Sequence, residues 1–233
     1  MPYALTEWTA VVPIRAGSRG LPGKNVRELA GKPLYRHAVD TALQAGASQV
    51  LVSTDIPEVL NANHPVGVRL IFRPDELAGD GVDMAPVMLH ALKTCDVSGP
   101  VVLLQATSPL RQAADVLSAL EQLLSGQFDL VMSVTPAESA VLKWGFVAFE
   151  GRYQPLSEAR YCFANRQSLP PVFRPNGAVY AMQADWFVTN RGFVTERIGT
   201  VIMPAERSRD IDNLSDFEYC AQQMSNSPEK KAS

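Results

Sequence analysis

Short apolar runs alternate with amphipathic stretches along most of the chain. The runs are bounded by turn-forming residues and predict β-strands at 8–14, 49–53, 68–72, 100–105, 130–134, 177–182 and 200–203. The amphipathic stretches predict helices at 33–45, 86–94, 115–125 and from about residue 215. Because the strand segments are continuously apolar, helices should cover both faces of the sheet. The pattern predicts an α/β fold in three layers with a mostly parallel sheet, in which ligands bind beyond the carboxyl ends of the strands.

The alternation breaks between residues 137 and 175. Prolines at positions 136, 155, 170, 171 and 175 frame this segment, and a hairpin is expected at about 144–153. We interpret it as a small lobe inserted into a single domain that covers residues 1–224. The polar residues 225–233 are expected to form a disordered tail.

The composition narrows the classes of function. With 233 residues, 46% of them hydrophobic and 19% charged, the chain is long enough for one α/β domain. The net charge is −3 and the charges are scattered, so we expect no nucleic-acid partner. The cysteines, Cys95, Cys162 and Cys220, form no zinc motif. No apolar run approaches about 18 residues and no basic leader is apparent, so we expect no membrane association and a cytoplasmic location.

The loop after the first strand has the composition of a phosphate-binding loop. Within eleven residues it contains Gly17, Gly20 and Gly23 together with Arg15, Arg19 and Lys24. Glycines let backbone N–H groups approach an anion, and the cations can neutralise phosphate charge. Five residues separate Gly17 from Gly23 where a P-loop has four, and the G-x-G-x-x-G dinucleotide pattern is absent. The alternative is a surface turn with solvated cations.

The segment Arg15-Ala-Gly-Ser-Arg-Gly-Leu-Pro-Gly-Lys-Asn25, extended by Gly31-Lys-Pro-Leu34, resembles the signature of the acylneuraminate cytidylyltransferases, or CMP-sialate synthetases. The resemblance implies a Rossmann-like nucleotidyltransferase fold and a loop that surrounds the phosphates of CTP. The nucleotide-binding residues implied in the loop are Arg15, Gly17, Ser18, Lys24 and Asn25. Lys24 and Arg15 would be catalytic, with Lys24 as the principal cation on the transferring phosphate.

Further segments are similar to blocks of the same family. Val52-Ser-Thr-Asp55 follows the second strand, residues 72–80 follow the third, and residues 103–111 lie at the end of the fourth. By this resemblance, Arg73 contacts the nucleotide. Gln105 would lie where the nucleotide and the acceptor sugar meet, and so would bind both.

Two segments, 165–170 and 175–180, resemble the family stretches R-x-R-Q-D-L-P and N-G-A-I-Y and imply a sugar pocket. An acidic sugar needs a cation for its carboxylate, which Arg166 can bind with two parallel hydrogen bonds and Lys143 as a point charge. Asn176 and Tyr180 can hydrogen-bond hydroxyls or an N-acyl group. Taken singly, Arg166 could equally pair with a surface carboxylate such as Glu158, and Tyr180 could be a core aromatic.

Asp210 and Asp212 stand two residues apart before the last helix, so an extended backbone would point both to one side. Two carboxylates beside a nucleotide suit Mg²⁺, which prefers oxygen ligands and bridges carboxylates to phosphates. The resemblance implies that both are catalytic and bind this metal. Alone, the pair could equally be a solvated loop with Asp212 at a helix start. Asp216 is expected to complement the dipole of the last helix.

The resemblance covers roughly residues 8–220 and implies transfer of CMP from CTP to an acidic nonulosonic sugar, N-acetylneuraminic acid or a close relative, with release of pyrophosphate. The alternatives are a cytidylyltransferase for pseudaminic, legionaminic or ketodeoxyoctonic acid, another sugar nucleotidyltransferase, or a catalytically silent nucleotide-sugar sensor. The sequence departs from the family pattern at Ala106, where Pro is usual, and at Ser168, where Asp is frequent. Asp83 and Met84 stand where a Ser near the cytosine is expected.

The resemblance also implies a homodimer in which the inserted lobe reaches the partner. Lys143 or Arg166 could then serve the neighbouring subunit's site. The lobe residues Trp144, Phe146 and Phe149 suit a buried interface and equally a core beneath the hairpin.

Overall fold

A seven-stranded sheet forms the centre of the computed structural model, which describes residues 7–17 and 20–226. The strand order is β11-β7-β10-β6-β1-β4-β5. These strands are β1 (Thr9–Pro13), β4 (Gln49–Thr54), β5 (Val68–Phe72), β6 (Pro100–Leu103), β7 (Leu130–Ala137), β10 (Val172–Gln183) and β11 (Ile198–Ile202). Neighbouring strands pair in parallel except at β10, which is antiparallel to both β6 and β7. The expected mostly parallel sheet is confirmed.

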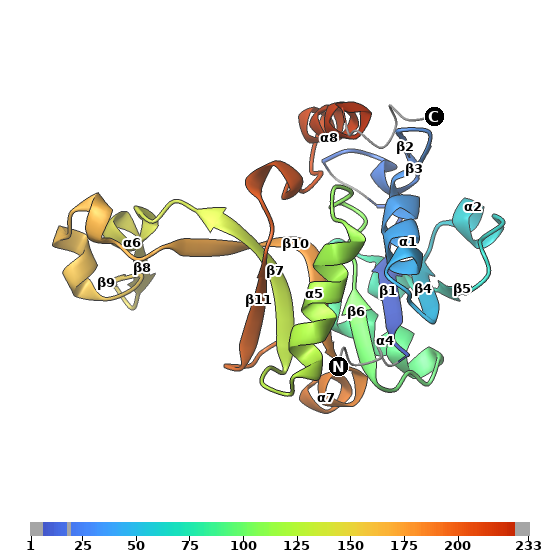
Figure 1. Ribbon diagram of the computed structural model, residues 1–233, viewed down its shortest axis with the longest axis horizontal. Coiled ribbons are helices and arrows are strands. Elements are labelled where there is room, and N and C mark those ends of the chain that lie inside the picture. The colour runs from blue at the N-terminus through green and yellow to red at the C-terminus, as the bar shows by residue number, and fades with distance from the viewer. Residues whose placement is uncertain (1–6, 18–19, 227–233) are drawn as a thin grey trace.

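Helices cover both faces of this sheet (Figure 1). One core cluster joins the sheet to α1 (Leu34–Gln44) and α5 (Ala113–Leu124), and a second joins it to α4 (Met84–Thr94) and α7 (Ala184–Asn190). Successive strand residues enter opposite clusters, as Val11 and Val12 of β1 do, because side chains alternate across a strand. The strands are therefore apolar on both faces, and the three-layer α/β fold is confirmed.

Shorter elements complete the core around the loop that follows β1. Helix α8 (Leu214–Asn226) packs on a third cluster that includes Leu21, Leu29 and Leu34. The remaining short elements of this body are β2 (Glu28–Leu29), β3 (Lys32–Pro33), α2 (Pro57–Leu60), α3 (Asp75–Ala78) and the 3-10 turns η1 (Lys24–Val26) and η4 (Ala205–Arg207). Helix α8 thereby covers the segment from which the loop returns to α1.

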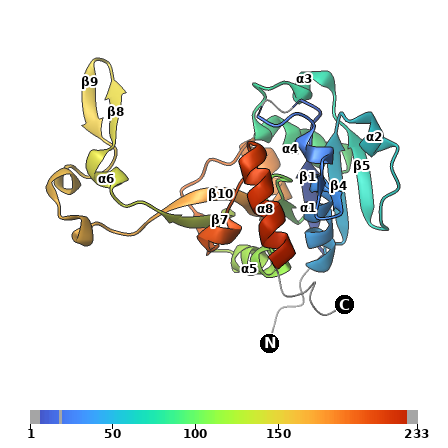
Figure 2. The same ribbon diagram turned by 90° about the horizontal axis from the view of Figure 1, so that it is seen from above.

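An inserted lobe projects from one side of the sheet (Figure 2). The ends of β7 and β10 form its two arms, pairing from Val172 with Ala137 down to Pro175 with Val134. The register shifts between Pro175 and Tyr180, where β10 enters the body. Beyond the arms lie α6 (Val141–Trp144), β8 (Phe146–Phe149), β9 (Arg152–Pro155), η2 (Ala159–Phe163) and η3 (Arg166–Ser168). Strands β8 and β9 form the expected hairpin.

The structure also corrects the sequence-based prediction in places. The apolar run at 177–182 is the inner half of a longer strand, β10, whose residues Phe173 to Pro175 are exposed because that end of the strand leaves the core. Helix α7 was not expected, since its seven residues are too few for a clear period. Helix α8 runs to Asn226, so the chain remains helical past residue 225, and residues 227–233 lie outside the described part. Within the described residues, none of the helices has the length and apolar character needed to cross a membrane.

Candidate active site

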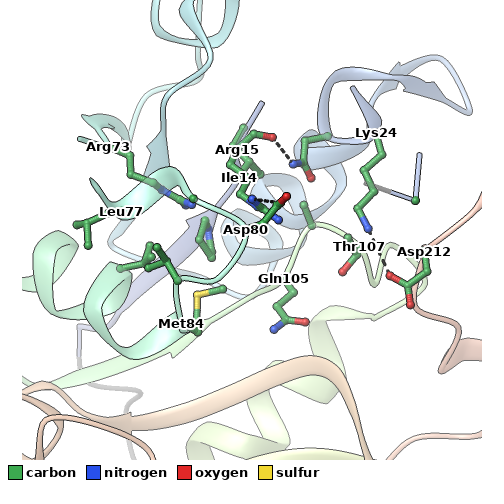
Figure 3. Close-up of a pocket in the computed structure, with 17 residues that line it drawn as sticks. Ile14, Arg15, Lys24, Arg73, Leu77, Asp80, Met84, Gln105, Thr107 and Asp212 are labelled. Carbon is green, nitrogen blue, oxygen red and sulfur yellow. Dashed lines mark hydrogen bonds and ion pairs between the residues drawn. The ribbon is translucent and has the colours of Figure 1, made fainter. Parts of the chain in front are cut away.

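A cavity of about 410 Å³ opens at the carboxyl ends of β1 and β6 (Figure 3). It is lined by residues that follow these strands, among them Arg15 and Gln105, and by Lys24, Arg73 and Asp212. Its position agrees with the rule that open α/β sheets bind ligands beyond the carboxyl ends of their strands. Of the residues predicted for the site, the cavity therefore brings together Arg15, Lys24, Asn25, Arg73, Gln105 and Asp212.

The loop after β1 is fixed at several points by hydrogen bonds. The amide N–H of Ala16 donates to Asp55 Oδ1 at 2.9 Å, and Asn25 Nδ2 donates to the carbonyl of Arg15 at 2.9 Å. Gly23 has a left-handed backbone with φ of 66°, which starts the turn η1 and suits glycine. Gly17 lies in the exposed part of the loop beside Arg15, and Ser18 lies outside the described residues.

Lys24 joins this loop to the carboxylate segment. Its Nζ donates to the carbonyl of Ile211 at 2.6 Å and lies 3.5 Å from Asp212 Oδ1, and only 15% of the side chain is exposed. Gly20 approaches the same segment so closely that a Cβ built on it would lie 2.1 Å from the carbonyl oxygen of Asp212. The loop and residues 211–212 therefore form one packed unit in which position 20 has no room for a side chain.

Two guanidinium groups line the other end of the cavity. Arg15 Nη1 pairs with Asp80 Oδ1 at 2.6 Å and donates to the carbonyl of Ala78 at 3.2 Å. Arg73 is buried, and its Nη2 donates to the carbonyl of Ser53 at 3.0 Å. Burial lowers the pKa of Arg73 to about 10, with Asp55 opposing the shift, so this residue stays charged at neutral pH. This end of the cavity can hold a strongly anionic ligand.

Apolar side chains line the cavity beside these cations. Leu77, Val82, Met84 and Val87 come from α4 and the segment before it. Met84 contributes a thioether where the family pattern has a Ser, while Asp83, the residue before it, is exposed and is not part of the lining. A cationic end next to an apolar wall can accommodate a phosphorylated ligand that also carries a ring.

The two carboxylates of this segment differ in their surroundings. Ile211 between them is buried in the core, and its N–H donates to the carbonyl of Thr107 at 2.8 Å. Asp212 lines the cavity, whereas Asp210 is not part of the lining and is more buried. Burial raises the pKa of Asp210, and its Oδ1 is buried without a hydrogen-bond partner. An orphaned carboxylate oxygen beside a second carboxylate fits a site for a hard cation.

Asp216 anchors the carboxylate segment from the first turn of α8. Its Oδ2 accepts hydrogen bonds from the N–H groups of Asp212 at 3.1 Å and Asn213 at 3.2 Å. Asp216 thus holds the segment rather than facing the cavity. Within the described residues, no group of three or more His, Cys, Asp or Glu side chains could hold a metal ion, so the pair would leave most of the coordination sphere to other ligands.

Tyr180 and Asn176 both lie in β10, but neither lines the cavity. Tyr180 is half-buried, and its ring packs 6.0 Å from that of Phe193, which matches the alternative of a core aromatic. Burial also raises the pKa of the Tyr180 hydroxyl.

Asn176, predicted to hydrogen-bond a sugar, is bound to protein groups within this chain. The residue is 4% exposed, and both polar atoms of its side chain have protein partners. Asn176 Oδ1 accepts hydrogen bonds from Ser133 Oγ at 2.6 Å and from the N–H of Ala178, and its Nδ2 donates to Ser208 Oγ at 2.9 Å. These bonds join β7, β10 and the segment that leads to Asp210, so in this structure Asn176 stabilises the fold around the site.

Lys143 and Arg166 lie in the lobe and do not line the cavity of their own chain. Lys143 Nζ donates to the carbonyl of Ala164 at 3.0 Å, and Arg166 Nη2 pairs with Glu138 Oε1 at 2.9 Å on the surface. Glu158, the partner considered from the sequence, pairs with Arg160 instead. Figures 1 and 2 show the lobe directed away from the body, so the two halves of the predicted site are separated within one chain.

Three residues of the site were not assigned from the sequence: Asp80, Thr107 and Arg111. Asp80 pairs with Arg15, Thr107 holds the carboxylate segment, and Arg111 is buried behind Gln105. All three lie inside segments that carry the family resemblance, 72–80 and 103–111. Their position in these segments was the one sign in the sequence that they belong to the site.

Comparisons with known proteins agree with this geometry. A family model described as cytidylyltransferase matches residues 9–174. The chain is 30% identical over 218 residues to the N-acylneuraminate cytidylyltransferase of Streptococcus agalactiae serotype III (strain NEM316), covering 89% of this chain and 51% of that protein. It is 32% identical over 222 residues to the CMP-N,N'-diacetyllegionaminic acid synthase of Legionella pneumophila (strain Philadelphia 1), covering 89% and 92%. The chain thus spans about half the length of the first relative and nearly all of the second.

A solved structure shares the fold. It is that of CMP:2-keto-3-deoxy-manno-octonic acid synthetase complexed with CTP, with a TM-score of 0.72, 20% identity, and coverage of 94% of this chain and 99% of the other. At 20% identity this structure supports the fold alone. The family model and the sequence relatives support membership of the family. The chain belongs to the cytidylyltransferase family.

Proposed function

We propose that the protein transfers CMP from CTP to an acidic nonulosonic sugar, N-acetylneuraminic acid or a close relative, giving a CMP-sugar and pyrophosphate. The observation that carries the proposal is the single cavity that joins Arg15, Lys24 and Arg73 to Gln105 and Asp212. The names of the relatives support it, since they include cytidylyltransferases for N-acylneuraminate and pseudaminic acid and a synthase for CMP-N,N'-diacetyllegionaminic acid.

In the proposed reaction the anomeric hydroxyl of the sugar attacks the α-phosphorus of CTP. The bond to the bridging oxygen breaks and pyrophosphate leaves with the electron pair. Lys24 and Arg15 stabilise the negative charge that develops, with help from backbone N–H groups of the loop. Lys24 Nζ keeps its hydrogen bond to the carbonyl of Ile211, whereas its longer contact with Asp212, at 3.5 Å, can be replaced by a phosphate oxygen. Water, or one of Asp210 and Asp212, would accept the hydroxyl proton.

We further propose that Asp210 and Asp212 hold Mg²⁺. The orphaned Oδ1 of Asp210 and the exposed carboxylate of Asp212 fit this role, and phosphate oxygens and water would supply the other ligands. The ion would neutralise phosphate charge during the transfer. The protein's own contribution is to fix the two carboxylates through Thr107, Lys24 and Asp216.

The lobe supports a homodimer as part of the proposal. Trp144 is 67% exposed and Phe163 is 90% exposed, and Phe146 and Phe149 are exposed too, so these residues do not form a core beneath the hairpin. Exposed aromatic residues in one small lobe favour burial against another protein surface. A second copy of the chain could receive the lobe so that Lys143 and Arg166 reach its cavity and bind the sugar carboxylate. We expect this enzyme to act in the cytoplasm.

The decisive experiment measures pyrophosphate release by the purified protein with Mg²⁺, each of the four ribonucleoside triphosphates, and a panel of acids that includes N-acetylneuraminic, legionaminic, pseudaminic and ketodeoxyoctonic acid. Release with CTP and one or more of these acids supports the proposal and identifies the substrate. Folded protein that binds nucleotide but releases no pyrophosphate with any pair would contradict it and would favour a nucleotide-sugar sensor. Asp212→Asn should abolish the release, and Glu121→Gln, an exposed change in α5, is the matched control.

A further inference from the structure

Arg111 is a buried cation at the back of the candidate site. It follows β6 and precedes α5, and 4% of it is exposed. None of the ion pairs found among residues 7–17 and 20–226 involves it; Asp115 and Asp210 act on its charge only at longer range. Burial lowers the pKa of Arg111 to about 9, so the side chain remains charged at neutral pH. Burying a charge without a direct counter-ion costs free energy, so other contacts must offset that cost.

Those contacts are two backbone carbonyls, one of Gln105 and one of β10. Arg111 Nη2 donates to the carbonyl of Gln105 itself, and Nη1 donates to the carbonyl of Ala178 in β10 at 2.6 Å. One planar guanidinium thereby joins the end of β6 to β10, at the point where the register of β10 shifts. A hydrocarbon side chain could fill the space but could not hold both carbonyls.

Gly177 in β10 lies close to the side chain of Gln105. A Cβ built on Gly177 would lie 2.7 Å from Gln105 Oε1, so the backbone of β10 passes close to the amide of Gln105. Gly177 also has a φ of 78°, which favours glycine. Gln105 lines the cavity, Arg111 holds its backbone carbonyl, and Gly177 leaves room beside its side-chain amide. The orientation of Gln105 therefore depends on the bridge that Arg111 makes.

We propose that Arg111 is a positioning residue that acts through Gln105: it fixes the amide of Gln105 against the substrates without touching them. This inference rests on the proposed function. In Figure 3 Gln105 lies below Arg15, between Met84 and Asp212, and under the proposed function a sugar hydroxyl and the α-phosphate would meet beside it. A displaced amide there lowers the rate of transfer more than it weakens the binding of CTP, because misplacement of a reacting group acts on the reacting geometry.

The test compares Arg111→Met, Arg111→Lys and Gln105→Ala with the double variant Arg111→Met/Gln105→Ala. Arg69→Met, an exposed change in β5, is the matched control. The measurements are kcat and KM for both substrates, the dissociation constant of CTP without the acceptor, and the unfolding midpoint. We expect Arg111→Met to lower kcat by about 10- to 100-fold and to change CTP binding by less than about 3-fold. The double variant should be no slower than Gln105→Ala, and Arg111→Lys should recover stability more fully than kcat.

A kcat for Arg111→Met equal to that of Arg69→Met, or full additivity in the double variant, would overturn the inference. If Arg111→Met does not fold, Arg111→Lys replaces it, since it retains the charge and loses one of the two carbonyl contacts. The kcat of Arg111→Lys and of its double variant with Gln105→Ala are then compared in the same way. Failure of the proposed function gives a different result, in which the wild-type protein itself transfers no CMP. In that case the CTP affinities decide: Arg111→Met should change CTP binding by less than about 3-fold and by no more than Gln105→Ala does, and a larger loss overturns the inference.

Discussion

Two cations of the body, Lys24 and Arg73, and one cation of the lobe, Arg166, are held in opposite ways. In the body, Lys24 and Arg73 are held by backbone carbonyls and are largely buried, so their positions are fixed before any ligand binds. In the lobe, Arg166 is exposed and makes a surface ion pair with Glu138, which contributes little to stability. Prearranged cations suit a site complete within one chain. An exposed cation on a projecting aromatic lobe suits a site completed by another surface.

Replacement of Lys24 should have the largest effect, because it removes the central cation of the body. We expect Lys24→Ala to lower kcat/KM for pyrophosphate release by about 100- to 1,000-fold, the range observed when one prearranged charge-stabilising donor is lost. Steady-state kinetics with CTP and the preferred acid measure this. Lys93→Ala, an exposed change at the end of α4, is the control. Equal rates for the two variants would contradict a role of Lys24 in stabilising the transferring phosphate.

The sequence predicts much of the body, but it does not predict the contacts of Asn176 or the distance of the lobe from the cavity. Continuous apolar runs and a glycine-rich loop are local signals, so β1, α1 and the position of Lys24 followed from them. The burial of Asn176 could not be predicted, because its partners Ser133 and Ser208 are distant in sequence and have no pattern of their own. The separation of Arg166 from the cavity depends on the arms β7 and β10, whose outer residues carry no apolar period.

Gly20→Ala should break the packing between the loop and the carboxylate segment. The new methyl group would overlap the carbonyl of Asp212, and one of the two segments must shift. We expect kcat/KM to fall by about 10- to 100-fold, since the shift displaces Lys24 and Asp212 together. Gly192→Ala, whose Cβ would meet only Ala85 at 3.9 Å, should keep the wild-type rate. Full activity of Gly20→Ala would mean that the loop moves away freely.

Asn176→Ala should test the structural role assigned to this residue. The change leaves Ser133 and Ser208 with fewer hydrogen-bond partners in a buried place and should lower the free energy of unfolding by about 1–3 kcal/mol. Urea denaturation measures the difference, and Asn63→Ala, at an exposed position, should change it by less than about 0.5 kcal/mol. Unchanged stability with a large increase in KM for the acid would instead support direct contact with the sugar.

Polar substitutions in the lobe should have the smallest effect on the folded chain. Trp144→Ser together with Phe163→Ser changes side chains that are mostly exposed, so the far-ultraviolet circular dichroism of the variant should match that of the wild type. If the lobe is an interface, light scattering should show a dimer for the wild type and a monomer for the variant. A dimer in both cases would mean that the aromatic residues of the lobe do not hold the assembly together.

Two inactive variants, when mixed, show whether the body of one chain binds the nucleotide while the lobe of a second copy binds the sugar carboxylate. Lys24→Ala and Arg166→Ala are each measured alone and after coexpression as a mixed dimer. We expect about a quarter of the wild-type rate for the mixture. Half of the dimers are mixed, and in each of those one site combines an intact Lys24 with an intact Arg166. If the mixture is no more active than the single variants, Arg166 does not act across the dimer and the division between body and lobe is contradicted.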